Sequence, residues 1–185
     1  MRRFLLGLTI TAVLVALGAS SGTGSAATSG RSTRAVVSTR MASLPLLQSQ
    51  VLAAINDLRR KQGLVPLKPN SALAAAAFEQ SASMAAHGFF GHASYGGSPF
   101  WKRVAAKYTI SNGSWKVGEN LVWRSPWLSA QSALELWLAS PEHRDNLLSP
   151  AWREIGLGAV HVSSAPGVYE GRAVTILTAD FGVRR

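Results

Sequence analysis

Two histidines and one glutamate are the residues of this sequence best placed for chemistry, because each stands beside a break in the predicted secondary structure. His92 follows the end of a predicted helix, and His143 comes two residues after Pro141. Glu119 opens an apolar extended stretch. Imidazole titrates near neutrality, binds metal ions and serves as a general base. The three residues are 27 and 24 positions apart, so only the fold can bring them together, and the residues alone leave a shared site and separate structural roles both open.

Several familiar catalytic motifs are absent from the sequence. It contains no His-Glu-x-x-His zinc helix, no Gly-x-Ser-x-Gly nucleophile elbow and no glycine-rich phosphate loop. It also contains no cysteine, which excludes disulfides, thiolate metal sites, a cysteine nucleophile and a lipoprotein anchor. The other two histidines, His87 on an alanine-rich helix and His161 near a strand end, are expected to be surface or structural residues.

Six tryptophans are many for so small a chain, and four of them, Trp101, Trp115, Trp123 and Trp127, crowd one region. Exposed tryptophans could stack on sugar rings or sit at a lipid interface, whereas buried ones would be core residues. Trp137 has the helical spacing of a core residue. The sequence favours core packing and leaves the ligand-binding alternative open.

The elements that must position these residues alternate between helical and extended patterns. Apolar residues at helical spacing predict a first helix over residues 45–62, with Gly63 as its C-cap. Asn70 or Ser71 can cap the second helix, which ends at Gly88. The remaining predictions are helices at 99–107, 129–139 and from 141, and strands at 119–124, 155–162 and 173–181. Helices first and an antiparallel pair at the end predict an α+β fold.

The N-terminus has the three parts of an export signal. Arg2 and Arg3 are a positive start, residues 4–17 are apolar, and small residues then offer a cleavage site after Ala26 or Ala27. We therefore expect residues 1–27 to be a signal peptide, 28–43 a flexible linker and 44–185 one domain. An uncleaved anchor is the alternative, but the apolar run is shorter than the ~20 residues that span a bilayer.

The chain is strongly basic, with 19 Lys and Arg against 9 Asp and Glu and a formal net charge of +10. Loss of the two arginines of the signal peptide lowers the charge to +8. Such an excess favours anionic partners such as cell-wall polymers or acidic lipid headgroups, although it also serves solubility. No nucleic-acid-binding motif accompanies the charge, so we expect no specific nucleic-acid partner. The expected state is a secreted monomer.

A series of short motifs resembles the CAP superfamily of cysteine-rich secretory proteins, antigen 5 and plant pathogenesis-related proteins, in its short bacterial branch. The motifs span most of the chain after the linker, in the family's order. They are Ile55-Asn56-Asp57-Leu58-Arg59, Gly63-Leu64, Pro66-Leu67, Phe90-Gly91-His92, Gly118-Glu119-Asn120, Trp137, Ser140-Pro141-Glu142-His143-Arg144-Asp145-Asn146-Leu147-Leu148, Glu154-Ile155-Gly156-Leu157-Gly158 and Asp180-Phe181-Gly182.

The resemblance implies a three-layer α-β-α sandwich with a central antiparallel sheet, and a cavity in which His92, Glu119 and His143 meet as catalytic-type residues. Two neutral imidazoles and a carboxylate form an incomplete shell for Zn²⁺ or another divalent metal, with His92 and His143 as the metal ligands. The chain departs from the eukaryotic members in lacking disulfides and in having Ser140 where they have a second glutamate. Asp180 is the candidate replacement carboxylate.

The resemblance does not supply a reaction, because fold does not fix function. Three functions remain open, and whether the protein is an enzyme is undecided. The first is an extracellular binding module for a lipid, a cell-wall glycan or a metal-dependent ligand. The second is a hydrolase that uses a histidine base and a metal-bound water. The third is a basic protein held at the anionic cell envelope by charge alone.

Overall fold

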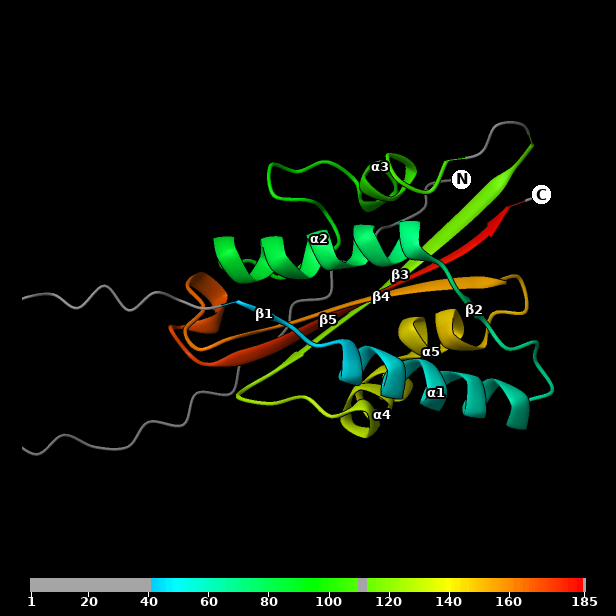
Figure 1. Ribbon diagram of the computed structural model, residues 1–185, viewed down its shortest axis with the longest axis horizontal. Coiled ribbons are helices and arrows are strands. Elements are labelled where there is room, and N and C mark those ends of the chain that lie inside the picture. The colour runs from blue at the N-terminus through cyan, green and yellow to red at the C-terminus, as the bar shows by residue number, and fades with distance from the viewer. Residues whose placement is uncertain (1–40, 110–112, 185) are drawn as a thin grey trace, which may run out of the picture. The chain divides into compact units, whose positions relative to one another are not determined.

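The computed structural model describes residues 41–109 and 113–184 (Figure 1). The predicted signal peptide, its cleavage position and residues 28–40 of the predicted linker lie outside the described residues. The last two residues of that linker, Ala42–Ser43, form strand β1 and pair with β4 (Glu154–Val162). The sheet therefore begins two residues before the predicted domain boundary at residue 44.

One five-stranded sheet forms the middle layer. Its strand order is β1-β4-β5-β3, and the two-residue β2 (Lys68–Pro69) also pairs with β4. The long strands β3 (Trp115–Arg124), β4 and β5 (Val174–Arg184) are antiparallel, whereas β2 is parallel to β4. The central strand β5 is buried along almost its whole length, and β3 is an edge strand.

Helices cover both faces of this sheet (Figure 1). One face carries α2 (Ser71–His87) and α3 (Phe100–Ala105). The other carries α1 (Pro45–Lys61), α4 (Ala130–Ala139) and α5 (Pro141–Leu148). This arrangement confirms the predicted α+β class and the α-β-α sandwich with its antiparallel sheet.

Helix α2 lies unusually close to the sheet because the contacting residues are small. Asn70 caps the helix by accepting hydrogen bonds from two backbone N–H groups, and Gly88 ends it in the left-handed region at φ +69°. A β-carbon on Gly156 would lie 2.0 Å from the backbone of α2, and one on Gly158 would lie 2.1 Å from it. The alanines of α2 and the glycines of β4 thus set the spacing of two layers.

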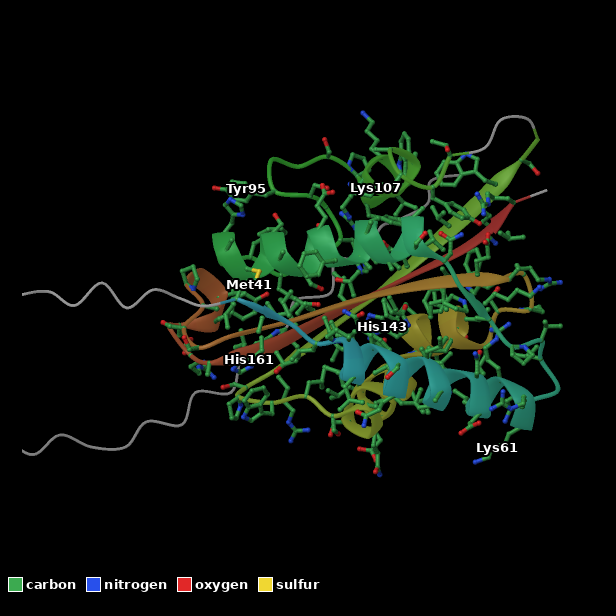
Figure 2. All side chains as sticks on the ribbon, in the orientation of Figure 1. Met41, Lys61, Tyr95, Lys107, His143 and His161 are labelled. Carbon is green, nitrogen blue, oxygen red and sulfur yellow. The ribbon has the colours of Figure 1, made fainter. Side chains whose placement is uncertain are left out.

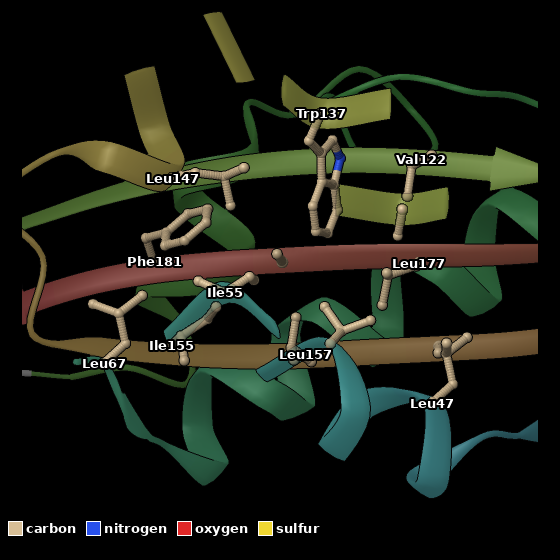
Figure 3. Packing of buried hydrophobic residues seen from close by; sticks show 14 of the residues in the cluster. Leu47, Ile55, Leu67, Val122, Trp137, Leu147, Ile155, Leu157, Leu177 and Phe181 are labelled. Atoms are coloured by element: carbon tan, nitrogen blue, oxygen red, sulfur yellow. The ribbon is translucent and has the colours of Figure 1, made fainter. Parts of the chain in front are cut away.

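The layer between the sheet and helices α1, α4 and α5 holds the main hydrophobic core, part of which Figure 3 shows. Trp137 lies in this core, and its indole N–H donates to the carbonyl of Leu121 at 3.0 Å. Trp137 is thus a core residue, as its spacing predicts. In contrast, Trp101 and Trp127 are exposed.

Arg59 is a buried cation that ties α1 to the far end of α5. Its side chain donates to the carbonyls of Val65, Leu147 and Ser149, the latter two at 2.7 and 3.0 Å. Its sequence neighbours Arg60 and Lys61 are exposed. Arg59 is therefore buried although it stands beside two exposed basic residues in the sequence.

Candidate functional site

Glu119 is the centre of the candidate site. It lies on β3 with its carboxylate buried beneath the layer that holds α2 and α3. One carboxylate oxygen accepts from Nδ1 of His92 at 2.8 Å, and the other accepts from the guanidinium of Arg103. Both oxygens are therefore committed to neighbouring side chains.

His92 presents its ring to solvent while Glu119 holds it from behind. The residue lies in the segment between α2 and α3, and its side chain is 53% exposed. With Nδ1–H donating to the carboxylate, Nε2 carries the free lone pair. A buried carboxylate thus fixes both the direction of the imidazole and the nitrogen that it offers.

Arg103 is the buried partner that compensates the charge of Glu119, and it also anchors the segment that carries His92. Its guanidinium donates to the amide oxygen of Gln80 at 2.8 Å and to the hydroxyl of Ser94 at 3.1 Å. The amide N–H of Gln80 donates to the carbonyls of Gly91 and Ala93 at 2.6 and 3.1 Å. These bonds hold the backbone on both sides of His92.

His143, labelled in Figure 2, lies on α5, which contacts the edge strand β3 from the other face of the sheet. Burial lowers the pKa of His143 most, His92 lowers it further, and Glu142 partly opposes these effects. The net direction favours a neutral His143 imidazole.

Two asparagines attach α5 to β3. The side-chain amide of Asn120 donates to the carbonyl of His143 at 2.9 Å. Asn146 donates to the side chain of Asn120 at 2.9 Å and to the carbonyl of Glu119 at 3.1 Å. A β-carbon on the adjacent Gly118 would lie 2.8 Å from both Asn146 and Trp152. Each residue of the Gly-Glu-Asn segment thus has a separate role in closing α5 onto the strand.

Asp180 joins the cluster behind Glu119 and has no access to solvent. The two residues are cross-strand partners in the pairing of β3 with β5. No donor among the described residues bonds to either oxygen of Asp180. Burial raises the pKa of Asp180 well above its ordinary value, and the neighbouring carboxylate of Glu119 raises it further. Asp180 therefore adds a second carboxyl group to the site, on its inner side.

The geometry differs from the predicted shell of two imidazoles and one carboxylate for a metal ion. Because both oxygens of Glu119 are engaged, this carboxylate orients His92 and is not free to coordinate. Within residues 41–109 and 113–184, no group of three or more His, Asp or Glu side chains is arranged to hold a metal ion. His92 and His143 as ligands of a divalent ion, and Zn²⁺ as that ion, stay predictions.

The other two histidines lie apart from this cluster, each against an aromatic ring. His87 stacks on Tyr95 with ring centroids 3.9 Å apart. His161 stacks on Trp127 at 3.8 Å and bonds to the hydroxyl of Thr175 at 3.1 Å. His161, labelled in Figure 2, lies on β4 where that strand pairs with β1. Both are structural or surface residues, as the sequence predicts.

The surface also has an apolar hollow of about 530 Å³, which does not include the site residues. It lies between the first turns of α1 and α2, along β4.

No helix of the described residues is long and apolar enough to cross a membrane.

The sequence did not reveal Arg103 and Gln80 as site residues. One signal for Gln80 was available, since it continues the buried line of Leu73 and Ala76 on α2. A polar residue on such a line must find partners inside the protein. Arg103 gave no comparable signal, because it follows Lys102 on a short helix and reads as part of a surface cluster.

Comparisons with known proteins identify relatives of this chain. The chain is 31% identical to the uncharacterized protein YkwD of Bacillus subtilis over 126 residues, which is 66% of this chain and 46% of YkwD. The chain thus spans about half the length of this curated relative.

Three solved structures share the fold. An extracellular protein of Bacillus anthracis that contains an SCP domain matches with a TM-score of 0.58 and 24% identity, over 75% of this chain and 40% of that one. An outer surface protein of Borrelia burgdorferi matches with a TM-score of 0.63 and 18% identity, over 80% of this chain and 99% of that one. A cysteine-rich secretory protein of Staphylococcus aureus matches with a TM-score of 0.50 and 20% identity, over 79% of this chain and 40% of that one.

The model of the cysteine-rich secretory protein family, CAP, matches residues 52–180, which is well over half of the sequence. The matched range contains His92, Glu119, His143 and Asp180. This chain therefore belongs to the CAP family of cysteine-rich secretory proteins.

Proposed function

We propose that this protein is a secreted binding domain that holds an extracellular ligand at His92 and His143. The observation that carries the proposal is the orientation of His92 by Glu119, with its free nitrogen directed outward and His143 close by. An exposed imidazole held by a buried ion pair is already organised for a ligand, so little ordering is needed when the ligand binds.

Secretion is part of this proposal. The N-terminal sequence has the order of a signal peptide, with Arg2 and Arg3, an apolar run and then small residues. Two structural relatives are described as an extracellular protein and an outer surface protein. Cleavage after Ala26 or Ala27 would release the domain outside the cell.

The ligand classes that fit are cell-wall glycans, lipids with anionic headgroups and ligands that bind through a divalent metal. Neutral imidazoles both donate and accept hydrogen bonds, and their free nitrogens coordinate Zn²⁺. The net charge of +8 without the signal peptide concentrates the protein at anionic surfaces. Charge would bring the protein to the envelope, and the histidine site would select the ligand.

The test is a binding experiment with matched histidine variants. Purified protein is sedimented with peptidoglycan, with phosphatidylglycerol vesicles and with phosphatidylcholine vesicles, with and without Zn²⁺. We expect saturable binding to one of these, lost in His92→Ala/His143→Ala and retained in the control His87→Ala/His161→Ala. Circular dichroism verifies the fold of both variants.

Two outcomes would reject the proposal. Binding that both double variants retain, and that disappears at high salt, would mean attraction by charge alone. A well-folded protein that binds none of the three materials would also contradict it. Calorimetry with Zn²⁺ alone tests the metal separately, since about one ion per chain is expected only if the two imidazoles coordinate it.

A hydrolase is the second candidate, because a histidine oriented by a buried carboxylate is also the arrangement of a general base. His92 would take a proton from water at Nε2, and Glu119 would stabilise the imidazolium. Release of soluble fragments from peptidoglycan, abolished in His92→Gln, would support this function. Glu119→Gln is the weaker test, because it leaves Arg103 buried without its partner.

A further inference from the structure

Asp180 and Glu119 form a pair of buried carboxyl groups that the proposed ligand site does not explain. They lie opposite each other on β5 and β3, and both are shielded from water. Glu119 accepts hydrogen bonds from His92 and Arg103. The oxygens of Asp180 receive none from the described residues, although buried polar groups are nearly always bonded.

The charges around this pair do not balance if both groups are ionised. Arg103 supplies one positive charge, and its two terminal nitrogens bond to Glu119, Gln80 and Ser94, whereas its Nε has no partner among the described residues. A second anion beside Glu119 would be uncompensated in a buried region, where an unpaired charge takes up a proton instead.

Apart from Arg103, the groups near Asp180 in the described part of the chain offer no cation. Its partner on β4 is Gly156, which has no side chain. On the same side of the sheet, Ser81 of α2 donates to the carbonyl of Gly158 and bonds to Thr178, both at 2.8 Å. Glu119 of β3 and Arg103 of α3 are the charged groups that act on Asp180, and His92 lies beyond Glu119 at the surface.

We propose that Asp180 keeps its proton at neutral pH and donates it in a hydrogen bond to Glu119, so that the two carboxyl groups share one negative charge. This bond gives Asp180 the partner that it otherwise lacks. It also completes the set of groups that hold Glu119, which are then His92, Arg103 and Asp180. Asp180 is then a positioning residue for the His92–Glu119 pair, whichever ligand the site binds.

The shared proton has a consequence for His92. With the proton shared, the imidazole faces one negative charge, which is already paired with Arg103. If both carboxyl groups were ionised, it would face two negative charges. The site can thus hold a histidine firmly by hydrogen bonding without surrounding it with excess negative charge. Sequence alone gives no sign of this, because residues 119 and 180 meet only through the pairing of β3 with β5.

The experiment is a pH titration of the Asp180 side chain by carbon-13 NMR of the carboxyl group in the native protein. We expect its chemical shift to stay at the protonated value from about pH 5 to about pH 8, whereas the same residue in urea-unfolded protein should titrate near pH 4. Assignment comes from the loss of one signal in Asp180→Asn. A native signal that ionises near pH 4 would overturn the proposal, whatever ligand the site binds.

The same variant provides a second readout. Asp180→Asn cannot ionise but can still donate to Glu119, so the folded protein should be at least as stable as the native one at pH 8. Asp180→Leu keeps the branching of the side chain but removes the donor, and it should lower stability at both pH 5 and pH 8. If Asp180→Asn is instead less stable than the native protein at pH 8, Asp180 accepts hydrogen bonds as an anion and the shared proton is wrong.

Discussion

Glu119 and Asn120 are neighbours on β3 and bind opposite helical layers of the protein. Glu119 holds His92 and Arg103 in the layer of α2 and α3. Asn120 donates to the backbone of His143 in α5, on the other face. Because successive side chains of a strand point to opposite faces, two adjacent residues can organise a site around the edge of the sheet. The Gly-Glu-Asn motif therefore connects the part of the site that holds His92 with the part that holds His143.

Because the glutamate and asparagine side chains bind different layers, we expect that the surroundings of His143 can be perturbed without those of His92. Asn120→Ala removes the bond to His143 and one of the two acceptors of Asn146, so we expect a loss of about 1–3 kcal/mol in unfolding free energy. The NMR signals of the His143 ring should move more than those of the His92 ring. Equal changes at both rings, or none at His143, would contradict the separation. Gln131→Ala, an exposed change on α4, is the control.

The local elements were predictable because their signals lie within a few residues. Asn70 caps α2, Gly88 ends it, and the line from Leu47 through Val51 to Ile55 forms the buried face of α1. Strand β1 was not predictable, since two residues carry no periodicity and Ala42–Ser43 are extended only because β4 pairs with them. Short-range chemistry defined the helices, and long-range pairing defined the edges of the sheet.

His92, Glu119 and His143 stood out by residue type and position, but only the family resemblance predicted that they meet. The structure brings His92 and Glu119 into contact. What motifs could not give is which groups Glu119 would bind. That depends on Arg103, which comes from a separate helix, and on the strand register that faces Glu119 with Asp180.

Substitution of Arg103 should lower the free energy of unfolding far more than substitution of the adjacent Lys102. Arg103→Ala leaves Glu119 buried without its cation, and removing one partner of a buried ion pair destabilises a protein by about 3–5 kcal/mol. Lys102→Ala changes an exposed residue and should alter the free energy of unfolding by no more than about 0.5 kcal/mol. Urea denaturation of the two variants measures the difference. Similar losses would mean that the ion pair with Glu119 contributes little.

Asp180 should make the protein less stable as the pH rises from about 4. The pKa of Asp180 is raised in the folded state, so above the ordinary aspartate pKa the unfolded chain releases a proton that the folded chain retains. Stability from this group is thus fully present at low pH and falls with rising pH until the folded group itself ionises. The difference in unfolding free energy between the native protein and Asp180→Asn, measured from pH 4 to 8, isolates this effect. A difference that is constant over this range would disprove it.

The pKa of His143 should depend on the presence of His92. Burial and the charge of His92 both lower the pKa of His143, so His92→Ala should raise that pKa part of the way to its ordinary value, with burial still lowering it. His87→Ala, on the outer face of α2, should leave it unchanged. NMR titration of the ring signals provides the measurement. An unchanged pKa in His92→Ala would mean that the two imidazoles do not interact and would remove the structural reason for a shared site.

The contact between α2 and the sheet should be the least tolerant part of the scaffold. A β-carbon at Gly158 would lie 2.1 Å from the backbone nitrogen of Phe78, so Gly158→Ala must move α2 away from β4. Overpacking of this kind typically destabilises by about 1–3 kcal/mol, and here backbone rather than a flexible side chain has to yield. Because α2 carries Gln80, the variant should also loosen the segment around His92 and speed hydrogen exchange there. Gly91→Ala lies in that same segment with no atom within 4 Å of its added carbon, and it should leave stability nearly unchanged. If the two variants unfold at the same urea concentration, the close approach of α2 to β4 does not determine the stability of the domain.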